Sequence, residues 1–139
     1  MPYIAKVAVG EYDFLNIFGN DYETIDGTGA RDYVHVVDLA SAHVSAFINS
    51  VKLSNFEIMN VGTGQATTVL ELLKKFEHAS GVIIKSKYLS RRDGDLAVVY
   101  ANSARAMKLL KWSPKFSIDQ MCKDTWRWQK NHINDYKIC

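Results

Sequence analysis

The stretch DGTGARDYVHVVD (Asp26–Asp38) constrains the fold more than any other part of the sequence. Its first half contains Gly27 and Gly29, which permit backbone angles that a β-carbon disfavours, so we expect a tight turn there. Its second half, Arg31–Val37, is rich in β-branched residues and predicts a strand that leads into an apolar helix.

One face of this predicted strand carries most of its chemistry. Because side chains alternate along a strand, Arg31, Tyr33 and His35 would share one side, opposite Val34 and Val36. Such a polar face suits a strand that lines a binding cleft. An ordinary edge strand with a solvated polar face explains the same pattern, so both interpretations stand at this point.

Composition indicates one globular domain and excludes several functional classes. The 139 residues are 47% hydrophobic and 23% charged, which is enough apolar material for a core. The net charge of +2 gives no electrostatic reason to expect nucleic-acid binding. Cys122 and Cys139 make no disulfide framework, which favours a reducing, cytoplasmic compartment. No apolar run approaches the roughly 20 residues of a membrane span, and no signal peptide is recognisable.

Strands and helices are expected to alternate, which predicts an α/β arrangement. Besides the strand in the opening stretch, strands are expected at Leu15–Phe18, Phe56–Val61 and Val82–Leu89. Helices are expected from the start to Gly10, from Asp38 to about Val51, from about Val69 to Ser80, through about Leu110, and to about Asn131. The last four have capping residues at their starts, namely Asp38, Thr68, Asn102 and Ser117. The predicted core-facing stripe of the second helix is Leu39, Ala42, Ala46, Phe47 and Val51.

The turn Gly62-Thr63-Gly64 lies between a predicted strand and a predicted helix, as in half of a dinucleotide-binding unit. The dinucleotide motif has a third glycine where this chain has Thr67, so the match to a phosphate cradle is incomplete. A tight turn that lets the helix pack closely on the strand is the favoured interpretation.

The loop Ser90–Leu96, SRRDGDL, is the second concentration of charged groups. Arg91 and Arg92 suit bidentate binding of phosphate oxygens. Asp93 and Asp95 allow a divalent-metal interpretation, although the adjacent arginines would compete for the same carboxylates. A solvated turn remains the third interpretation.

Several catalytic motifs are missing from the sequence. No tyrosine is followed four residues later by lysine, so the Tyr-xxx-Lys pair of short-chain dehydrogenases is absent. There is no His-xxx-His or Cys-xx-Cys spacing, no GxSxG elbow and no Walker loop. We therefore expect groups that bind anions and rings, with neither a metal site nor catalytic residues in this chain.

Six segments together resemble the C-terminal part of the UDP-glucose 4-epimerases, which are extended short-chain dehydrogenase/reductases. They follow that family's order and spacing and cover nearly the whole chain: Met1–Gly10, Leu15–Tyr22, Asp26–Ala40, Asn60–Gly64, Arg91–Leu96 and Asp124–Gln129. The pattern RDYxHVxDLA marks the broader extended family, and FGNDY together with RRxGDL narrows the match to the 4-epimerases.

This resemblance implies the substrate-binding C-terminal part of an extended Rossmann-type epimerase, with a small mixed sheet and flanking helices. Residues 1–139 would form one UDP-sugar-binding part, with the strand near 56–61 belonging to the cofactor-binding sheet. The family's N-terminal part, which binds NAD and carries the catalytic serine, tyrosine and lysine, is absent from this sequence.

The resemblance also implies a site for the base and the sugar. Asn16 and Phe18 would line the uracil, with Phe18 as an aromatic face and the Asn16 backbone reading the base edge. Val99 occupies the position where family members carry either a bulky tyrosine or a small residue. Val99 is similar to the roomy version, which implies space for N-acetylated UDP-hexosamines.

The phosphates and the ribose have their own implied partners. Arg31 would bind the diphosphate, Arg92 would clamp the phosphates, and Tyr33 would lie beside the nucleotide. Asp95 would accept a hydrogen bond from a ribose hydroxyl.

The implied function is the interconversion of UDP-glucose and UDP-galactose with NAD, in a complete enzyme that is expected to be a cytoplasmic homodimer. This chain alone is expected to bind the UDP-sugar without epimerising it. Two alternatives stay open: a non-catalytic nucleotide-sugar-binding module, and a different extended-family epimerase or dehydratase of nucleotide sugars.

Overall fold

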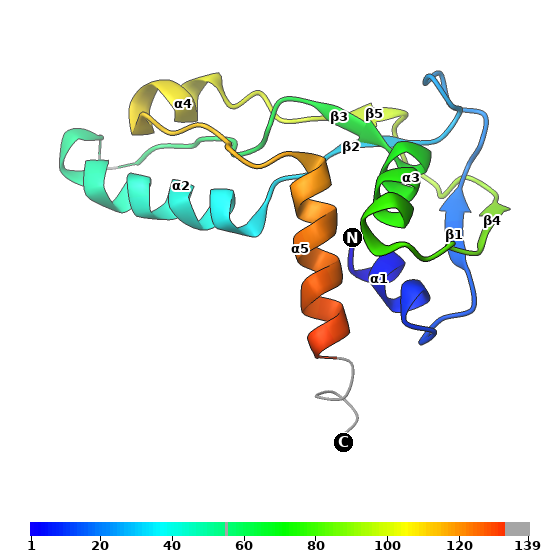
Figure 1. Ribbon diagram of the computed structural model, residues 1–139. Helices are drawn as coiled ribbons and strands as arrows, with labels where there is room; N and C mark the ends of the chain where they lie inside the picture. Colours follow the sequence, from blue (N-terminus) through cyan, green and yellow to red (C-terminus); the bar gives the residue numbers. More distant parts are fainter. Residues whose placement is uncertain (55, 133–139) are drawn as a thin grey trace.

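The computed structural model describes residues 1–54 and 56–132, and it is an α/β structure (Figure 1). The helices are α1 (Pro2–Ala8), α2 (Val36–Asn49), α3 (Val69–Ser80), α4 (Ala104–Leu110) and α5 (Ile118–Asn131), with the 3₁₀ turn η1 (Ser50–Lys52) after α2. The strands are β1 (Leu15–Phe18), β2 (Ala30–Asp32), β3 (Ala66–Thr68), β4 (Ser86–Leu89) and β5 (Val98–Val99). None of the helices in this described part combines the length and the hydropathy that a membrane span requires.

The strands form two small sheets, which confirms the expected mixed arrangement. β1 and β4 are parallel, with Leu15 opposite Ser86. In the second sheet β2 is central, antiparallel to β3 and parallel to β5. Arg31 therefore lies opposite Thr67 on one side and Val99 on the other. The sequence did not indicate β3 and β5, because strands of two or three residues carry no periodic signal.

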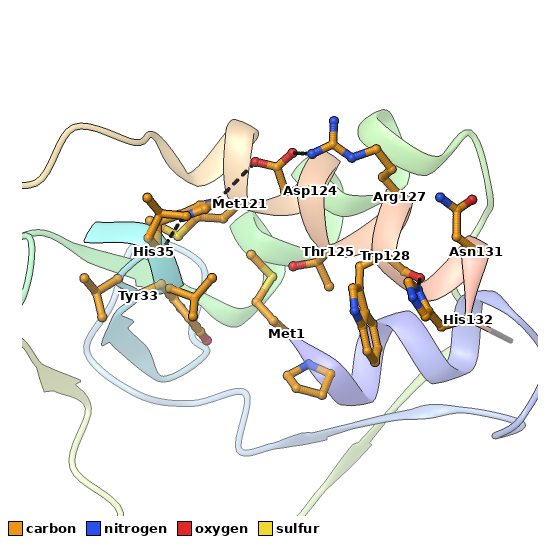
Figure 2. Close-up of a pocket in the computed structure, with 14 residues that line it drawn as sticks. Met1, Tyr33, His35, Met121, Asp124, Thr125, Arg127, Trp128, Asn131 and His132 are labelled. Atoms are coloured by element: carbon orange, nitrogen blue, oxygen red, sulfur yellow. Dashed lines mark hydrogen bonds and ion pairs between the residues drawn. The ribbon is translucent and has the colours of Figure 1, made fainter. Parts of the chain in front are cut away.

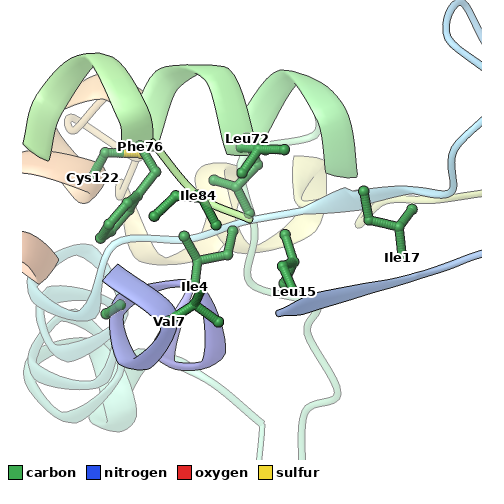
Figure 3. Close-up of a cluster of buried hydrophobic side chains, with 10 residues drawn as sticks. Ile4, Val7, Leu15, Ile17, Leu72, Phe76, Ile84 and Cys122 are labelled. Carbon is green, nitrogen blue, oxygen red and sulfur yellow. The ribbon is translucent and has the colours of Figure 1, made fainter. Parts of the chain in front are cut away.

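The main core joins α1, α3, α5 and β1 (Figure 3). Phe76, Ile17 and Leu72 are almost completely buried in it. Trp126 of α5 meets the Phe76 ring edge-on, with 6.3 Å between the ring centroids. The buried members of the main core are Ile4, Ala5, Val7, Leu15, Ile17, Leu72, Leu73, Phe76, Ile84 and Cys122. Cys122 is a free thiol, and Cys139 lies outside the described residues.

A minor core lies between α2 and α4, and its buried members are Ala42, Ala106, Leu110 and Trp112. The Trp112 indole N–H donates to the carbonyl of Asp38 (3.1 Å) and to the Ser41 hydroxyl (2.8 Å). The buried carboxylate of Asp38 accepts from the backbone N–H groups of Lys115 and Phe116, both at 3.0 Å. These bonds tie α2 to the segment that leads into α5.

Two of the predicted helix caps are confirmed, and the predicted cap of α4 is displaced by one residue. Thr68 accepts a hydrogen bond from the Glu71 N–H at 3.1 Å to begin α3, and Gly81 ends this helix in the left-handed conformation at φ +70°. Ser117 accepts from the Gln120 N–H at 3.2 Å to begin α5. Asn102 accepts from the Ala104 N–H at 3.2 Å, although the N-cap position of α4 is Ser103.

The prediction of a strand over Arg31–Val37 is wrong beyond Asp32, and the prediction that Asp38 caps the second helix is wrong as well. α2 begins at Val36, and its N-cap is His35, whose ring accepts a hydrogen bond from the Val37 N–H at 3.1 Å. This side-chain bond satisfies one of the free donors at the helix start and draws Val36 and Val37 out of the strand.

The strand predicted at Phe56–Val61 is also absent, and β4 begins at Ser86 rather than at Val82. The segment 56–61 alternates between more and less exposed side chains as a strand does, but no described segment pairs with it. A strand without a partner has no ladder of hydrogen bonds.

The predicted core stripe of α2 is only partly buried. Ala42 packs in the minor core, whereas Leu39 is 37%, Phe47 82% and Val51 90% exposed. Phe56 and Ile58 of the segment 56–61 are exposed as well. α2 and α4 extend together to one side of the molecule (Figure 1). We call α2, η1, the segment 56–61 and α4 the arm.

Candidate functional site

A pocket of about 370 Å³ brings together residues that are far apart in the sequence. It lies beside β1 and receives side chains from α1, α3, the end of β2 and the loop before β5. Six of the seven predicted site residues line it: Asn16, Phe18, Arg31, Tyr33, Arg92 and Asp95. The seventh, Val99, does not line the pocket but is the β5 neighbour of Arg31. We call this cavity the β1 pocket.

Strand alternation gives the β1 pocket its wall. Leu15 and Ile17 are buried in the main core, while Asn16 and Phe18 on the opposite side of the strand are less buried. The Arg92 guanidinium lies over the Phe18 ring, 4.7 Å from its centroid. An aromatic face and a cation therefore meet at one end of the pocket.

Two arginines and one carboxylate make the charged end of the pocket. The Arg31 guanidinium donates to the backbone carbonyls of Ala30 (2.8 Å) and Leu96 (2.9 Å), which fixes its position. Its other nitrogen lies 3.4 Å from Asp95, whose second oxygen accepts from Arg92 at 2.7 and 2.8 Å. Two positive charges against one negative charge leave this end positive, which suits an anion such as a phosphate.

The neighbouring arginine has a different role. Arg91 forms an ion pair with Asp21 at 2.7 Å and lies over the Tyr22 ring, 4.1 Å from its centroid. The hydrogen bond from Arg91 holds the pKa of Asp21 below its usual value. Arg91 thus joins the loop after β4 to the turn after β1, and only Arg92 of the pair lines the β1 pocket.

The metal interpretation of this loop receives no support. Asp95 already accepts from two arginines, and residues 1–54 and 56–132 contain no group of three histidine, cysteine or acidic side chains that would hold a metal ion.

The glycine turn at 62–64 is held from inside the protein. One oxygen of Asp32 accepts from the Thr63 N–H at 3.0 Å, and the other accepts from the Gly64 N–H at 2.9 Å and the Ala101 N–H at 3.2 Å. Burial acts to raise the pKa of Asp32, but these hydrogen bonds outweigh it and keep the pKa below its ordinary value. A β-carbon on Gly62 would come within 2.6 Å of this carboxylate. The Thr63 and Gly64 N–H groups, which a phosphate cradle would offer to an anion, therefore already donate to Asp32, which favours the tight-turn interpretation.

A second cavity, of about 780 Å³, opens between the start of α1, residues 33–37 and α5 (Figure 2). Tyr33 lines both cavities. The other labelled side chains at its wall include His35, Asp124 and Trp128.

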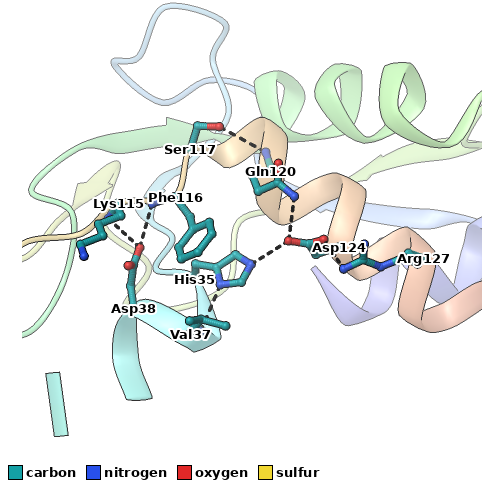
Figure 4. A network of polar contacts seen from close by, with 9 residues as sticks. All are labelled: His35, Val37, Asp38, Lys115, Phe116, Ser117, Gln120, Asp124 and Arg127. Atoms are coloured by element: carbon teal, nitrogen blue, oxygen red, sulfur yellow. Dashed lines mark hydrogen bonds and ion pairs between the residues drawn. The ribbon is translucent and has the colours of Figure 1, made fainter. Parts of the chain in front are cut away.

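His35 has a structural role at the edge of this second cavity (Figure 4). Its Nδ1 accepts from the Val37 N–H, its Nε2 lies 3.2 Å from Asp124, and its ring stacks on Phe116 with 4.4 Å between centroids. Hydrogen bonds from Gln120 and His35 hold the pKa of Asp124 below its usual value. One ring nitrogen of His35 thus caps α2 and the other joins α2 to α5. The predicted shared strand face of Arg31, Tyr33 and His35 does not exist, because β2 ends at Asp32.

Two aromatic residues of the β1 pocket, Tyr3 and Tyr22, were not predicted from the sequence. Tyr22 lines the pocket although no role was predicted for it. The only signal was its position in the FGNDY segment next to Phe18.

Comparisons with known proteins agree with this geometry. The family model for GDP-mannose 4,6-dehydratase matches residues 1–125. The UDP-glucose 4-epimerase of Bacillus subtilis is 47% identical over 137 residues, which are 99% of this chain and 40% of that protein. The UDP-glucose 4-epimerase of Bos taurus is 48% identical over 136 residues, 98% of this chain and 39% of that protein.

Solved structures give the same result. The UDP-glucose 4-epimerase of Stenotrophomonas maltophila, crystallised with NAD and formylated UDP-arabinopyranose, superposes with a TM-score of 0.92 at 44% identity over 96% of this chain and 40% of that one. The Bifidobacterium longum enzyme, in complex with NAD⁺ and UDP, gives a TM-score of 0.89 at 42% identity over 97% of this chain and 40% of that one. The chain spans about 40% of the length of these relatives. It belongs to the GDP-mannose 4,6-dehydratase family of extended short-chain dehydrogenase/reductases and corresponds within it to the C-terminal portion of UDP-glucose 4-epimerases.

Proposed function

We propose that this chain is the UDP-sugar-binding portion of a UDP-glucose 4-epimerase, which interconverts UDP-glucose and UDP-galactose. The observation that carries the proposal is the β1 pocket, in which an aromatic face and a positively charged end lie side by side. A nucleoside diphosphate has the matching order of groups, with a flat base, a ribose and two phosphates.

Each residue of the pocket then has a role that its position allows. The uracil lies against Phe18 and is read by the backbone of Asn16. Arg31, already fixed by two backbone carbonyls, and Arg92 bind the diphosphate. Asp95 exchanges its bonds to these arginines for a ribose hydroxyl.

Tyr33 lies beside the nucleotide in this proposal. It lines the β1 pocket and the second cavity at once, so it stands at the boundary between the nucleotide and whatever occupies the second cavity.

The chain positions the sugar and does not epimerise it alone. In the complete enzyme NAD removes a hydride from C4 of the hexose and returns it to the other face. The residues of this chain do not suit NAD, because Asp32 occupies the one glycine turn that resembles a phosphate cradle. We therefore assign NAD binding and the catalytic residues to the N-terminal portion, and we place the complete enzyme in the cytoplasm as a homodimer.

The domain organisation follows from the same proposal. Residues 1–139 form the UDP-sugar-binding part, and the segment 56–61 joins the cofactor-binding sheet as a strand. The exposed side chains of the arm, such as Phe47 and Phe56, support this assignment, because an apolar face of this kind needs a covering partner.

Val99 sets the width of the sugar site in this proposal. It is a small side chain, 43% exposed, next to Arg31 in the sheet. UDP-N-acetylglucosamine should therefore displace bound UDP-glucose in a competition titration, and a lack of competition would remove this assignment.

Calorimetry with UDP tests the proposed function. UDP should bind the 139-residue chain and raise its unfolding temperature, because a ligand that binds only the folded state stabilises it. Arg92→Ala and Asp95→Ala should abolish both effects. Arg105→Ala is the matched control, since Arg105 pairs with Glu57 on the arm, outside the pocket. Failure of UDP to bind the folded chain would contradict the proposal.

A second candidate is a nucleotide-sugar-binding module without chemistry. It is favoured by the observation that Ile4, Leu15 and Ile17, which line the β1 pocket, are buried members of the main core. Epimerase activity on adding the NAD-binding portion of a relative would exclude this alternative.

A further inference from the structure

Tyr22 is held rigidly at the wall of the β1 pocket. The side chain is 6% exposed, and the Arg91 guanidinium lies 4.1 Å from the ring centroid. Gly19 is so close that a β-carbon there would lie 2.5 Å from the Tyr22 ring. The Tyr22 N–H donates to the Gly27 carbonyl at 2.9 Å, which fixes the backbone as well. Such a ring has little freedom to turn toward another partner.

Two polar atoms of the pocket lining are buried without a hydrogen-bond partner among the described residues. They are the Tyr22 hydroxyl and the Asn16 side-chain oxygen. They are the two such side-chain atoms found in residues 1–54 and 56–132. Leaving a buried polar group unpaired is costly, so both occurring in one pocket indicates that a bound molecule completes their bonds.

We propose that the Tyr22 hydroxyl and the Asn16 side-chain oxygen bind the edge of the nucleobase and determine base specificity. The hydroxyl donates and the amide oxygen accepts, which matches a base edge with a carbonyl beside a ring N–H, as in uracil. This inference rests on the proposed function and adds side-chain contacts to the backbone contact of Asn16.

The base, rather than the phosphates, is the partner because the two unpaired atoms need both a donor and an acceptor. A diphosphate offers acceptors alone and gives the Asn16 oxygen no donor, whereas a base edge such as that of uracil offers a carbonyl and a ring N–H. Phe18 lines the same pocket and offers the stacking face, and the Arg92 guanidinium that lies over its ring turns to the phosphates when the base binds.

Tyr22→Phe tests the inference, because it removes the hydroxyl and leaves the ring under Arg91. The affinities of UMP, UDP and pyrophosphate are measured by calorimetry on the parent chain, on Tyr22→Phe and on the control Tyr100→Phe. Tyr100 is 60% exposed and does not line the pocket. We expect Tyr22→Phe to lower the affinities for UMP and UDP by the same factor, about fivefold to thirtyfold for one lost hydrogen bond. The affinity for pyrophosphate should not change. Tyr100→Phe should change none of them.

A thermal unfolding scan without ligand separates binding from folding. The unfolding temperature of Tyr22→Phe should be equal to or above that of the parent, because the change removes an unpaired buried hydroxyl. Unchanged UMP and UDP affinity would overturn the inference and indicate that water satisfies the hydroxyl. An equal loss of pyrophosphate binding would overturn it too, since that result indicates a structural role. If the parent binds no UDP, the proposed function fails and this inference fails with it.

Discussion

The main core beneath the β1 pocket and the arm differ in how far their large apolar side chains are buried. In the main core Phe76 and Ile17 are almost completely buried, and the arginines of the pocket pair with Asp95. On the arm, Phe47 and Val51 are more than 80% exposed. The packing that stabilises the described residues is therefore concentrated in the main core, and these side chains of the arm contribute little to it.

The largest expected effect contrasts one phenylalanine from each region. Phe76→Ala removes a fully buried ring and should lower the free energy of unfolding by about 3–5 kcal/mol. Phe47→Ala removes a ring that is 82% exposed and should change it by less than about 0.5 kcal/mol. Urea unfolding of both variants checks the contrast, and equal losses would show that the arm is as well packed as the main core.

A second prediction concerns the join between the regions. Asp38→Ala leaves the N–H groups of Lys115 and Phe116 without their acceptor and should cost about 2–4 kcal/mol. Hydrogen exchange should rise first at these two amides and along α2. If protection of α2 does not change, this carboxylate is not what holds the arm.

The buried thiol gives the main core a pH signature. Burial raises the pKa of Cys122 to about 11, from 9.0 for an exposed thiol. The folded chain therefore keeps the thiol proton at pH values where the unfolded chain loses it. The contribution of this thiol to the free energy of unfolding should be constant below about pH 9 and fall by roughly 1–3 kcal/mol toward pH 11. Cys122→Ala is the control and should lack this part of the decline when unfolding is measured across that range.

The smallest expected effect compares two side-chain hydrogen bonds at helix starts. Thr68→Ala removes the acceptor for the Glu71 N–H at the start of α3, beside the main core, and should cost about 1–2 kcal/mol. Asn102→Ala acts on the short, exposed end of α4 and should cost about 0.5 kcal/mol or less. The reverse order in thermal unfolding would mean that the arm contributes more to stability than its exposure indicates.

The two regions also differ in how well the sequence predicted them. β1, the capping bonds of α3 and α5 and the residues gathered in the β1 pocket followed from alternation, capping spacing and family resemblance. These signals are local, or they belong to a part of the fold that is contained in this chain.

The failures have physical causes. The strand at 31–37 ended early because the His35 ring caps α2, a competition that strand propensity does not register. The strand at 56–61 did not form because no described segment pairs with it, and Phe47 and Val51 stayed exposed because no described segment covers them. An apolar pattern in the sequence predicts burial, but it does not identify the segment that would provide the cover.

The most direct test of nucleotide binding in the β1 pocket is a titration of the isotope-labelled chain with UDP, followed by backbone amide chemical shifts. Saturable shifts are expected in β1, around Arg31 and Tyr33 and in the loop of Arg92 and Asp95, with the amides of α2 and α4 unchanged. Shifts centred on the arm, or none at all in a folded chain, would contradict the claim that the β1 pocket binds the nucleotide.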